Sequence, residues 1–332
     1  MRFYLTLSFL IFLISCSDNN QKMILNQNVG YVQGTTFNIK YLSSSLQDYK
    51  TEFDSIFSKI DLSLSLYIDS SIITRFNKGD TLIRLDSNFL SVFNAFKKVA
   101  NSTNGNFDCT ISPLINAWGF GVTKKEKIDS FIISDLLKNT GYQKIYLKND
   151  STLYNPSNVQ LNFDALAQGF TVDVIANFLE NNNINNFLIE IGGELRAKGE
   201  NINNKNWRIG IDKPSNIIDN KTRFQTVIEL KNKSVATSGN YRNFYIENGK
   251  KYSHSINPFN GYPVKHNLLS VTVITDECIY ADAYATAFMV MGVKKTKDFL
   301  LKNEDLDAFL IYQKNNILET WSTNGFKKIE LN

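Results

Sequence analysis

The run from Ser270 to Gly292 constrains the fold of this chain more than any other stretch. Residues 270–274 alternate in a way that suits a half-buried strand. Thr275 or Asp276 then offers an N-cap for an apolar helix, which we expect to end at Gly292. The run therefore predicts a strand, a turn and a helix.

Two side chains with oxygen ligands lie on this predicted helix. Asp282 and Thr286 are four residues apart, so they project from one helix face about one turn from each other. Mg²⁺ takes few carboxylates, keeps some waters and often shares its remaining positions with phosphate oxygens. The pair fits that demand, although the same spacing also suits an aspartate that pairs locally and a threonine that only packs.

Composition limits what such a site can be attached to. The chain has 332 residues, of which 43% are hydrophobic and 13% aromatic, enough for one large domain or two closely joined ones. Its formal charge of +4 comes from scattered residues, which argues against a basic nucleic-acid surface. The sequence contains no Cys/His zinc pattern, P-loop or Gly-x-Gly-x-x-Gly followed by an acidic residue.

The N-terminus has the features of a bacterial lipoprotein signal. The apolar run from Phe3 to Ile14 is about a dozen residues long, whereas a spanning helix needs roughly 20. Leu13-Ile14-Ser15-Cys16 has the order of a lipobox. We therefore expect a signal peptide at 1–15 and an acylated Cys16, the alternative being a plain secretory leader with an incidental cysteine.

The predicted organisation of the mature chain follows from that signal. We expect a lipidated polar tether at 16–28 and one folded domain at 29–332. Two cysteines remain in the domain, Cys109 and Cys278. An oxidising compartment permits a disulfide between them, but cysteine is also a common buried small hydrophobe, so pairing stays open.

A second candidate site begins at Asp164. We expect a strand at 159–163 to run into a helix whose first backbone N–H groups are free to meet an anion. Small residues at Ala165, Ala167 and Gly169 would allow a ligand to approach closely.

Two further stretches carry candidate chemistry. Asp108 lies in a strand-like run, 106–114, just before a glycine-flanked aromatic loop at 118–121 that could form a cofactor wall. His254 stands among serines, just ahead of a Pro/Gly turn, where a side chain can reach a cleft. A single histidine is more often structural, and aromatic residues such as Trp118 are more often part of a core.

The remaining patterns predict alternating strands and helices. Helical spacing recurs over 46–60, 87–99, 129–139 and 172–179, and strand patterns occur at 34–41, 144–147, 152–154, 187–194, 207–212, 224–230, 307–312 and 317–322.

Taken together and in order, these motifs resemble the ApbE family of FAD:protein FMN transferases, over nearly the whole mature chain. The motifs that carry the resemblance are Gly34-Thr35-Thr36-Phe37, Phe107-Asp108-Cys109-Thr110, Trp118-Gly119-Phe120-Gly121, Ala167-Gln168-Gly169-Phe170-Thr171-Val172-Asp173, Ile191-Gly192-Gly193-Glu194, Ala236-Thr237-Ser238-Gly239-Asn240-Tyr241-Arg242, 254–263 and Ala281-Asp282-Ala283 with Thr286.

The resemblance implies an α+β fold of mixed, largely antiparallel sheets with packed helices. It also implies transfer of FMN from FAD to a threonine hydroxyl of an acceptor protein, with release of AMP. Mg²⁺ would be held by Asp282, Thr286 and the backbone carbonyl near Ala165, and His254 would act on the acceptor hydroxyl. The residues that it implies around the FAD cleft are Gln33, Tyr67, Asn106, Phe107, Asp108, Gln168 and Ser238.

The sequence departs from the family pattern at three places. Gln33 stands where a methionine is common, Gln168 where a lysine is common, and Asp164-Ala165 where a Gly pair is common. The loss of the lysine removes a positive charge that could contact the FAD.

The resemblance and the lipobox together imply a location and leave two other functions open. We expect a membrane-anchored lipoprotein that faces the periplasm, with the inner membrane favoured over the outer. The alternatives are a Mg²⁺-dependent FAD pyrophosphatase, in which water replaces the threonine hydroxyl, and a non-catalytic periplasmic lipoprotein that binds FAD.

Overall fold

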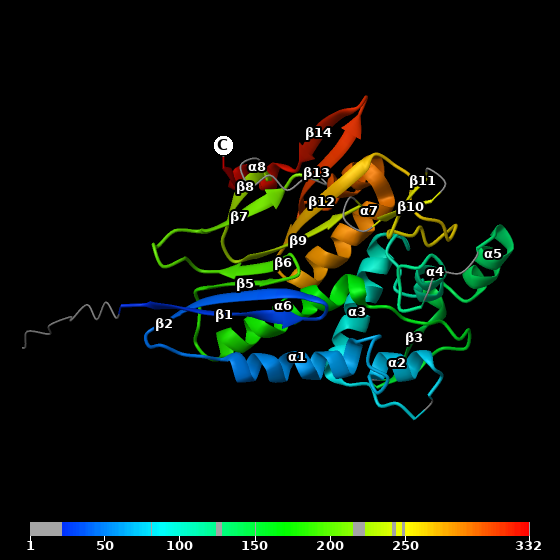
Figure 1. Cartoon of the computed structure of the whole chain (residues 1–332), viewed down its shortest axis with the longest axis horizontal. Coiled ribbons are helices and arrows are strands. Elements are labelled where there is room, and N and C mark those ends of the chain that lie inside the picture. Colours follow the sequence, from blue (N-terminus) through cyan, green and yellow to red (C-terminus); the bar gives the residue numbers. More distant parts are fainter. Residues whose placement is uncertain are drawn as a thin grey trace, which may run out of the picture.

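An eight-stranded sheet organises the chain (Figure 1), whose structure is a computed structural model that describes residues 22–80, 82–123, 128–149, 151–214, 223–240, 244–247 and 250–331. Adjacent strands of the sheet are antiparallel throughout. In spatial order they are β1 (Ile24–Val32), β2 (Thr35–Ser43), β5 (Phe187–Ile191), β6 (Glu194–Lys198), β9 (Lys233–Gly239), β12 (Leu268–Thr275), β13 (Asp307–Lys314) and β14 (Ile317–Ser322).

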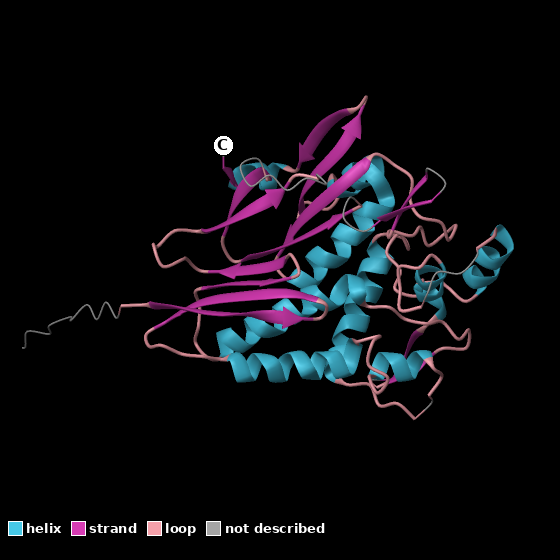
Figure 2. Cartoon of the chain, viewed as in Figure 1, coloured by secondary structure: helices cyan, strands magenta, loops and turns pink. Residues whose placement is uncertain are grey.

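Helices cover one face of this sheet, so that strands and helices form separate layers (Figure 2). Every second side chain of a strand projects from the same face of the sheet, which explains how the helices pack on it. In β2 these side chains are Phe37, Ile39 and Tyr41; they are buried and lie opposite buried residues of β5. The helices are α1 (Lys50–Leu64), α2 (Ile72–Asn77), α3 (Ser87–Ser102), α4 (Ser112–Ala117), α5 (Ser130–Lys138), α6 (Asp164–Asn181), α7 (Cys278–Leu300) and α8 (Asn324–Ile329), with a short 3₁₀ turn η1 (Tyr142–Lys144).

A smaller sheet packs on the other face of the main sheet. Ile228 of the small sheet, Phe326 of α8 and Phe309 of β13 share one core cluster, in which the two phenylalanine rings stack 4.9 Å apart. The small sheet contains β7 (Trp207–Asp212), β8 (Phe224–Leu230) and β15 (Glu330–Leu331), and two hairpins are formed by β3 (Tyr146–Asn149) with β4 (Thr152–Tyr154) and by β10 (Phe244–Glu247) with β11 (Lys250–Ser253).

The predicted fold class, α+β with largely antiparallel sheets and packed helices, is confirmed. Within the described residues, the one parallel contact is an isolated bridge between Ile111 and Gln160. No helix of this part of the chain is long and apolar enough to cross a membrane. The predicted signal peptide at 1–15 and Cys16 lie outside the described residues.

The predicted boundary of the tether at residue 28 is wrong. Residues 24–28 form the first half of β1 and pair with β2. The polar side chains that suggested a tether are buried and bonded: Asn26 donates to Ser43 Oγ (2.7 Å) and Asn28 donates to Asp48 Oδ1 (2.7 Å). Buried polar groups need such partners, and the sequence pattern does not reveal them.

The predicted start of α7 also needs correction. The helix begins after Glu277, because the Thr275 hydroxyl bonds the Glu277 carbonyl instead of capping the helix. The first helical segment ends at Gly292, as predicted, because its φ of +74° and ψ of 174° are not helical. A second segment follows this kink and carries α7 on to Leu300.

Two predicted strands are absent from the described structure. The run at 106–114 is a turn followed by α4, and 159–163 is extended chain with one isolated bridge. In both places side chains replace a strand partner: Asn77, for example, bonds both the N–H and the carbonyl of Leu161.

Candidate active site

The candidate site is built where α6 and α7 cross closely. Gly169 of α6 permits this approach, because a Cβ there would lie 2.6 Å from the Cys278 carbonyl oxygen and 3.0 Å from Asp282 Cβ. On α7, Ala281, Ala283 and Asp282 are all buried. Small residues on both helices therefore bring the two backbones together and place Asp282 between them.

Asp282 is a buried carboxylate held by one backbone bond. Its side chain is 7% exposed, and its Oδ2 accepts the N–H of Gly169 at 3.2 Å. Burial raises the pKa of Asp282 to about 7, the bond from Gly169 opposes the rise, and the negative charge of Asp164 adds to it. A nearby cation would hold this group ionised.

Thr286 lies one turn further along α7, as the spacing predicted. Its Oγ1 is 3.3 Å from Ser238 Oγ at the end of β9, so the two hydroxyls lie side by side at the wall of the cavity. The predicted FAD contact Ser238 and the predicted metal ligand Thr286 are thus neighbours.

Ala165 supplies a backbone oxygen to the same region. Its φ and ψ of −85° and 16° are not helical, and they kink α6 one residue after its start. The N–H of Gly169, one turn later, reaches the Asp282 carboxylate at 3.2 Å, and Ala165 lines the same cavity as Asp282. The kink and this position make the Ala165 carbonyl a candidate ligand beside the Asp282 carboxylate.

Two more acidic groups add negative charge around Asp282. Glu194 is buried, its Oε2 has no hydrogen-bond partner, and burial followed by the charge of Asp282 raises its pKa well above the ordinary value. Asp164 faces the cavity, and desolvation by the surrounding protein atoms raises its pKa, while the bond from Asn162 opposes the rise. No lysine or arginine of the described residues forms an ion pair with these three acids.

The donor set suits a hard divalent cation. It combines one carboxylate, one hydroxyl and one backbone carbonyl, with surplus negative charge nearby and room for further oxygen ligands. The described residues contain no cluster of three or more His, Cys, Asp or Glu side chains arranged as a metal centre, so protein carboxylates alone would not complete the coordination. A phosphate-bearing ligand could complete it.

All three candidate metal ligands line one large cavity of about 1560 Å³. This volume exceeds the roughly 300–1,000 Å³ of an ordinary small-molecule pocket. The predicted site residues that line the cavity are Asn106, Phe107, Asp108, Ala165, Gln168, Ser238, His254, Asp282 and Thr286.

Asp108 lines the cavity, but its carboxylate is occupied within the protein. Oδ1 accepts the N–H and the hydroxyl of Thr110 at 2.8 and 2.7 Å, and Oδ2 accepts the N–H of Tyr142 at 2.8 Å. Burial raises its pKa, and these bonds oppose the rise. Asp108 therefore shapes the loop that carries Asn106 and Phe107.

Two departures from the family pattern meet in space. Gln33 has a φ of +51° in the turn between β1 and β2, and its side chain donates to Thr171 Oγ1 at 2.9 Å. Gln168 donates to the Gln33 carbonyl at 3.5 Å and lines the cavity. Gln33 does not line the cavity, and neither does Tyr67, which is 75% exposed.

His254 follows β11 and lies at the cavity wall. Its ring is edge-on to Phe120, with centroids 6.4 Å apart. Phe120 continues into a stack of rings through Tyr245 and Tyr252 to Trp118. The predicted aromatic loop therefore supports His254 and reaches the cavity mainly through Phe120.

The sequence interpretation missed part of the cavity wall. Alternate residues of β2, namely Thr36, Asn38 and Lys40, face the cavity, and so does Glu190 of β5. In these strands polar residues alternate with buried apolar residues, so the polar side chains project from the opposite face of the sheet. This alternation was the sequence signal that could have indicated the cavity wall. Glu194 stood in a recognised motif but received no role.

The two cysteines of the domain are free and buried in the structure. Cys278 lies at the start of α7, and its Sγ is 3.5 Å from the carbonyl oxygen of Leu195 on β6. Burial raises the pKa of both thiols. They serve as packing groups here.

Comparison with known proteins supports one relationship throughout. The ApbE family profile matches residues 33–310. The FAD:protein FMN transferase of Haemophilus influenzae is 35% identical over 90% of this chain and 90% of its own length, and that of Vibrio cholerae is 31% identical over 97% and 96%.

Solved structures agree with these matches. The flavin transferase ApbE from Vibrio cholerae has a TM-score of 0.82 at 30% identity, covering 92% of this chain and 99% of its own. The apo form of the Pseudomonas stutzeri flavinyl transferase ApbE has a TM-score of 0.83 at 30% identity, covering 92% and 97%.

Proposed function

This chain belongs to the ApbE family and is an FAD:protein FMN transferase, and we propose that it uses Mg²⁺ bound at Asp282 and Thr286 to modify a threonine of its acceptor. The observation that carries the proposal is the single cavity in which the buried Asp282, the Thr286 hydroxyl and His254 face the same space.

The chain's own groups fit the proposed ion. Asp282 and Thr286 would hold Mg²⁺ together with the carbonyl of Ala165, while the N–H of Gly169 orients the carboxylate. When bound, the ion neutralises the pyrophosphate of FAD and the charge that develops on the AMP leaving group.

The proposed reaction is a phosphoryl substitution. The acceptor threonine Oγ attacks the phosphorus of the FMN half of FAD, the bond from that phosphorus to the bridging oxygen breaks, and AMP leaves with the electron pair. His254 takes the proton of the hydroxyl as the new P–O bond forms. The products are a phosphodiester between FMN and threonine, and AMP.

Most of the predicted FAD contacts line the cavity wall. We infer that Asn106, Phe107, Gln168 and Ser238 orient FAD, and that the buried Phe107 ring keeps water from one side of it. Gln33 contributes indirectly, because it supports Gln168 through its backbone carbonyl.

One assay separates this function from its two alternatives. Purified protein is incubated with FAD, Mg²⁺ and an acceptor domain that contains a candidate threonine, with the threonine-to-alanine acceptor as control. We expect flavin fluorescence on the acceptor band of a denaturing gel and AMP in equal amount. Free FMN with AMP would instead identify a pyrophosphatase, and unchanged FAD a binding protein.

We further propose that the protein is anchored through an acylated Cys16 and faces the periplasm. The support is the lipobox and the short connection: β1 begins at Ile24, so seven residues separate it from Cys16. Even fully extended, they span only about 25 Å at ~3.5 Å per residue. The catalytic domain would therefore work close to the membrane, on acceptors held there.

Cys16→Ser tests this location. The variant should lose labelling by a fatty-acid probe and should partition into the soluble fraction. The control Cys278→Ser should keep its label, because the proposed acyl chain is on Cys16 and the buried Cys278 does not carry it. Recovery of wild-type protein from its host with residues 1–15 still attached and no acyl chain would refute the anchor.

A further inference from the structure

On α6 and on α7, the helix face that carries the candidate metal ligands also carries a residue of a second contact between the two helices, Asp173 with Cys278. Along α6, Ala165, Gly169 and Asp173 are spaced four residues apart, as are Cys278, Asp282 and Thr286 along α7. The helices run antiparallel here, because Gly169 contacts Asp282 while Asp173 contacts Cys278. Asp173 therefore stands at one end of the same contact that brings the candidate ligands together.

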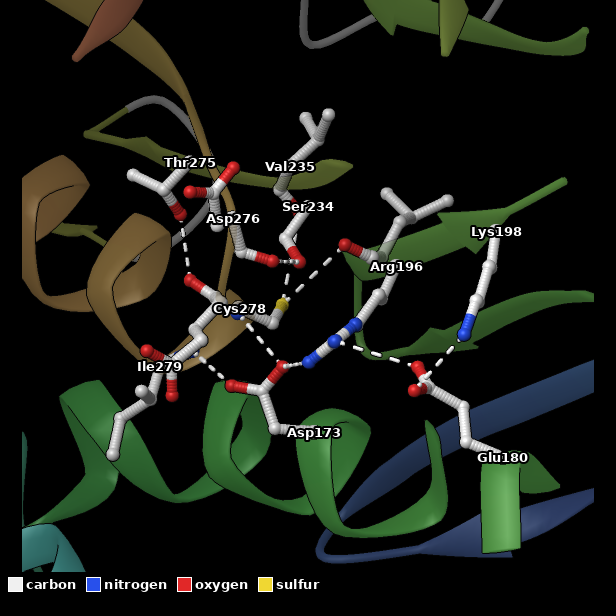
Figure 3. Close-up of polar contacts among 12 residues, drawn as sticks. Asp173, Glu180, Arg196, Lys198, Ser234, Val235, Thr275, Asp276, Cys278 and Ile279 are labelled. Atoms are coloured by element: carbon white, nitrogen blue, oxygen red, sulfur yellow. Dashed lines mark hydrogen bonds and ion pairs between the residues drawn. The ribbon is translucent and has the colours of Figure 1, made fainter. Parts of the chain in front are cut away.

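Asp173 binds the first turn of α7 with both of its oxygens (Figure 3). Oδ1 accepts the N–H of Cys278 at 2.9 Å, and Oδ2 accepts the N–H of Ile279 at 2.9 Å. The carboxylate is 6% exposed, so water competes little for these bonds. It caps the helix from a different element.

Among the residues that the structure describes, no other side chain bonds the free N–H groups at the start of α7. Its own N-cap residue, Glu277, makes no side-chain cap bond, and the first turn contains no acidic residue. Free N–H groups and the positive end of the helix dipole both favour a negative group at this position. Asp173 supplies that charge.

Arg196 bonds Asp173 directly and connects it to a wider polar network. Arg196 Nη1 donates to Asp173 Oδ1 at 2.7 Å, and Glu180 Oε1 lies 3.6 Å from Arg196 Nη2 (Figure 3). Lys198 completes the network with an ion pair to Glu180 at 3.0 Å. Arg196 of β6 is thus the residue of this network that bonds the carboxylate on α6 that caps α7, and Glu180 and Lys198 lie beyond Arg196.

We propose that Asp173 is a positioning residue for the metal site. It sets the register between α6 and α7, and that register decides whether the Ala165 carbonyl and the Asp282 and Thr286 side chains converge on one ion. This inference rests on the proposed metal-dependent function. A shift along the contact would leave each ligand intact but would separate the oxygens.

The test measures metal binding apart from activity. Wild type, Asp173→Asn and the control Glu180→Gln are compared by titration with Mn²⁺, followed by the electron paramagnetic resonance signal of the free ion. Asparagine keeps the size of the side chain but loses the charge and one acceptor oxygen. Glu180→Gln weakens the same polar network without touching α7.

We expect the Kd for Mn²⁺ to rise about 10- to 100-fold in Asp173→Asn, the usual effect of losing a group that orients metal ligands, and to stay within about twofold of wild type in Glu180→Gln. The Mg²⁺ concentration for half-maximal transfer should rise by a similar factor, with kcat at saturating Mg²⁺ nearly unchanged. A double variant, Asp173→Asn with Arg196→Met, avoids an unpaired buried cation and should show the same rise if the single variant folds poorly.

Two results would overturn the inference. A Kd for Mn²⁺ within twofold of wild type in folded Asp173→Asn or in the double variant would leave Asp173 with a purely structural role. An equal loss of affinity in Glu180→Gln would assign the effect to general loosening. Wild-type protein that binds no Mn²⁺ would instead contradict the proposed function itself, so the two failures are distinguishable.

Discussion

The two histidines of this chain differ in what their rings contact, although both stand in loops near the second half of the main sheet. His254 lies at the wall of the cavity against Phe120. His266 is bonded on both sides: Nε2 lies 2.6 Å from the Met289 carbonyl oxygen, and Nδ1 accepts the N–H of Leu268 at 3.3 Å. The first faces the cavity, and the second is bonded to the backbone on both sides.

His254→Ala should lower the transfer rate by about 10²–10⁴-fold, the usual span for a positioned acid or base. FAD binding should change little, because the other cavity residues remain. The rate is measured in single turnover and the affinity by quenching of FAD fluorescence, with His266→Gln as the control histidine. Loss of FAD affinity in proportion to the rate would make His254 a binding group, and an unchanged rate would remove it from the mechanism.

His266 should make stability depend on pH. Burial lowers its pKa below the ordinary 6.5, and the bond pattern requires the neutral ring with its proton on Nε2. As pH falls through 6.5, the unfolded chain takes up a proton that the folded protein resists, so the free energy of unfolding falls. Above 6.5 this contribution is fully present.

His266→Gln isolates that contribution, because glutamine can still donate to the Met289 carbonyl but does not titrate. Urea unfolding at pH 7.5 and 5.5 should show a smaller loss of stability for His266→Gln than for wild type. Equal losses in the two proteins would show that His266 does not cause the effect.

At the scale of elements, the α6–α7 contact depends on a residue without a side chain. Gly169→Ala would place a Cβ against the Cys278 carbonyl, and backbone cannot move aside as a flexible side chain can. We expect a loss of about 1–3 kcal/mol in the free energy of unfolding, typical of overpacking, together with weaker Mn²⁺ binding. Calorimetry and the Mn²⁺ titration measure the two effects, and wild-type values for both would mean that the helices are not in close contact.

Regular elements were predictable wherever the pattern of apolar residues was strong. The sequence located β7 and β8 at 207–212 and 224–230 and the hairpin of β3 and β4, and the strand–turn–helix at 270–292 is present as β12 and α7. Element ends were less predictable because distant groups decide them. The start of α7 is capped by Asp173, a residue 105 positions away from Cys278 in sequence, and no local pattern could indicate that.

At the scale of the whole molecule, it was the order of the sequence motifs, shared with the family, that predicted that most candidate site residues lie in one region. Asp282 and Thr286 follow from helix spacing, and their position opposite Ala165 required the family resemblance. The acidic surroundings formed by Asp164 and Glu194 depend on the packing of α6 against β6 and α7, which composition does not describe. Tyr67 and Gln33, predicted in the cleft wall, are not among the described residues that line the cavity; Tyr67 is 75% exposed, and the side chain of Gln33 bonds Thr171.

The central claim is that transfer of FMN depends on a metal ion held by Asp282, and Asp282→Ala tests it most directly. Mn²⁺ binding and flavin transfer to the acceptor are measured on the same preparation, with near-ultraviolet circular dichroism as a check of folding. We predict a folded variant that neither binds Mn²⁺ at micromolar concentration nor transfers flavin, because this is the one full negative charge proposed to contact the ion. Transfer by the variant within a few-fold of the wild-type rate would contradict the account.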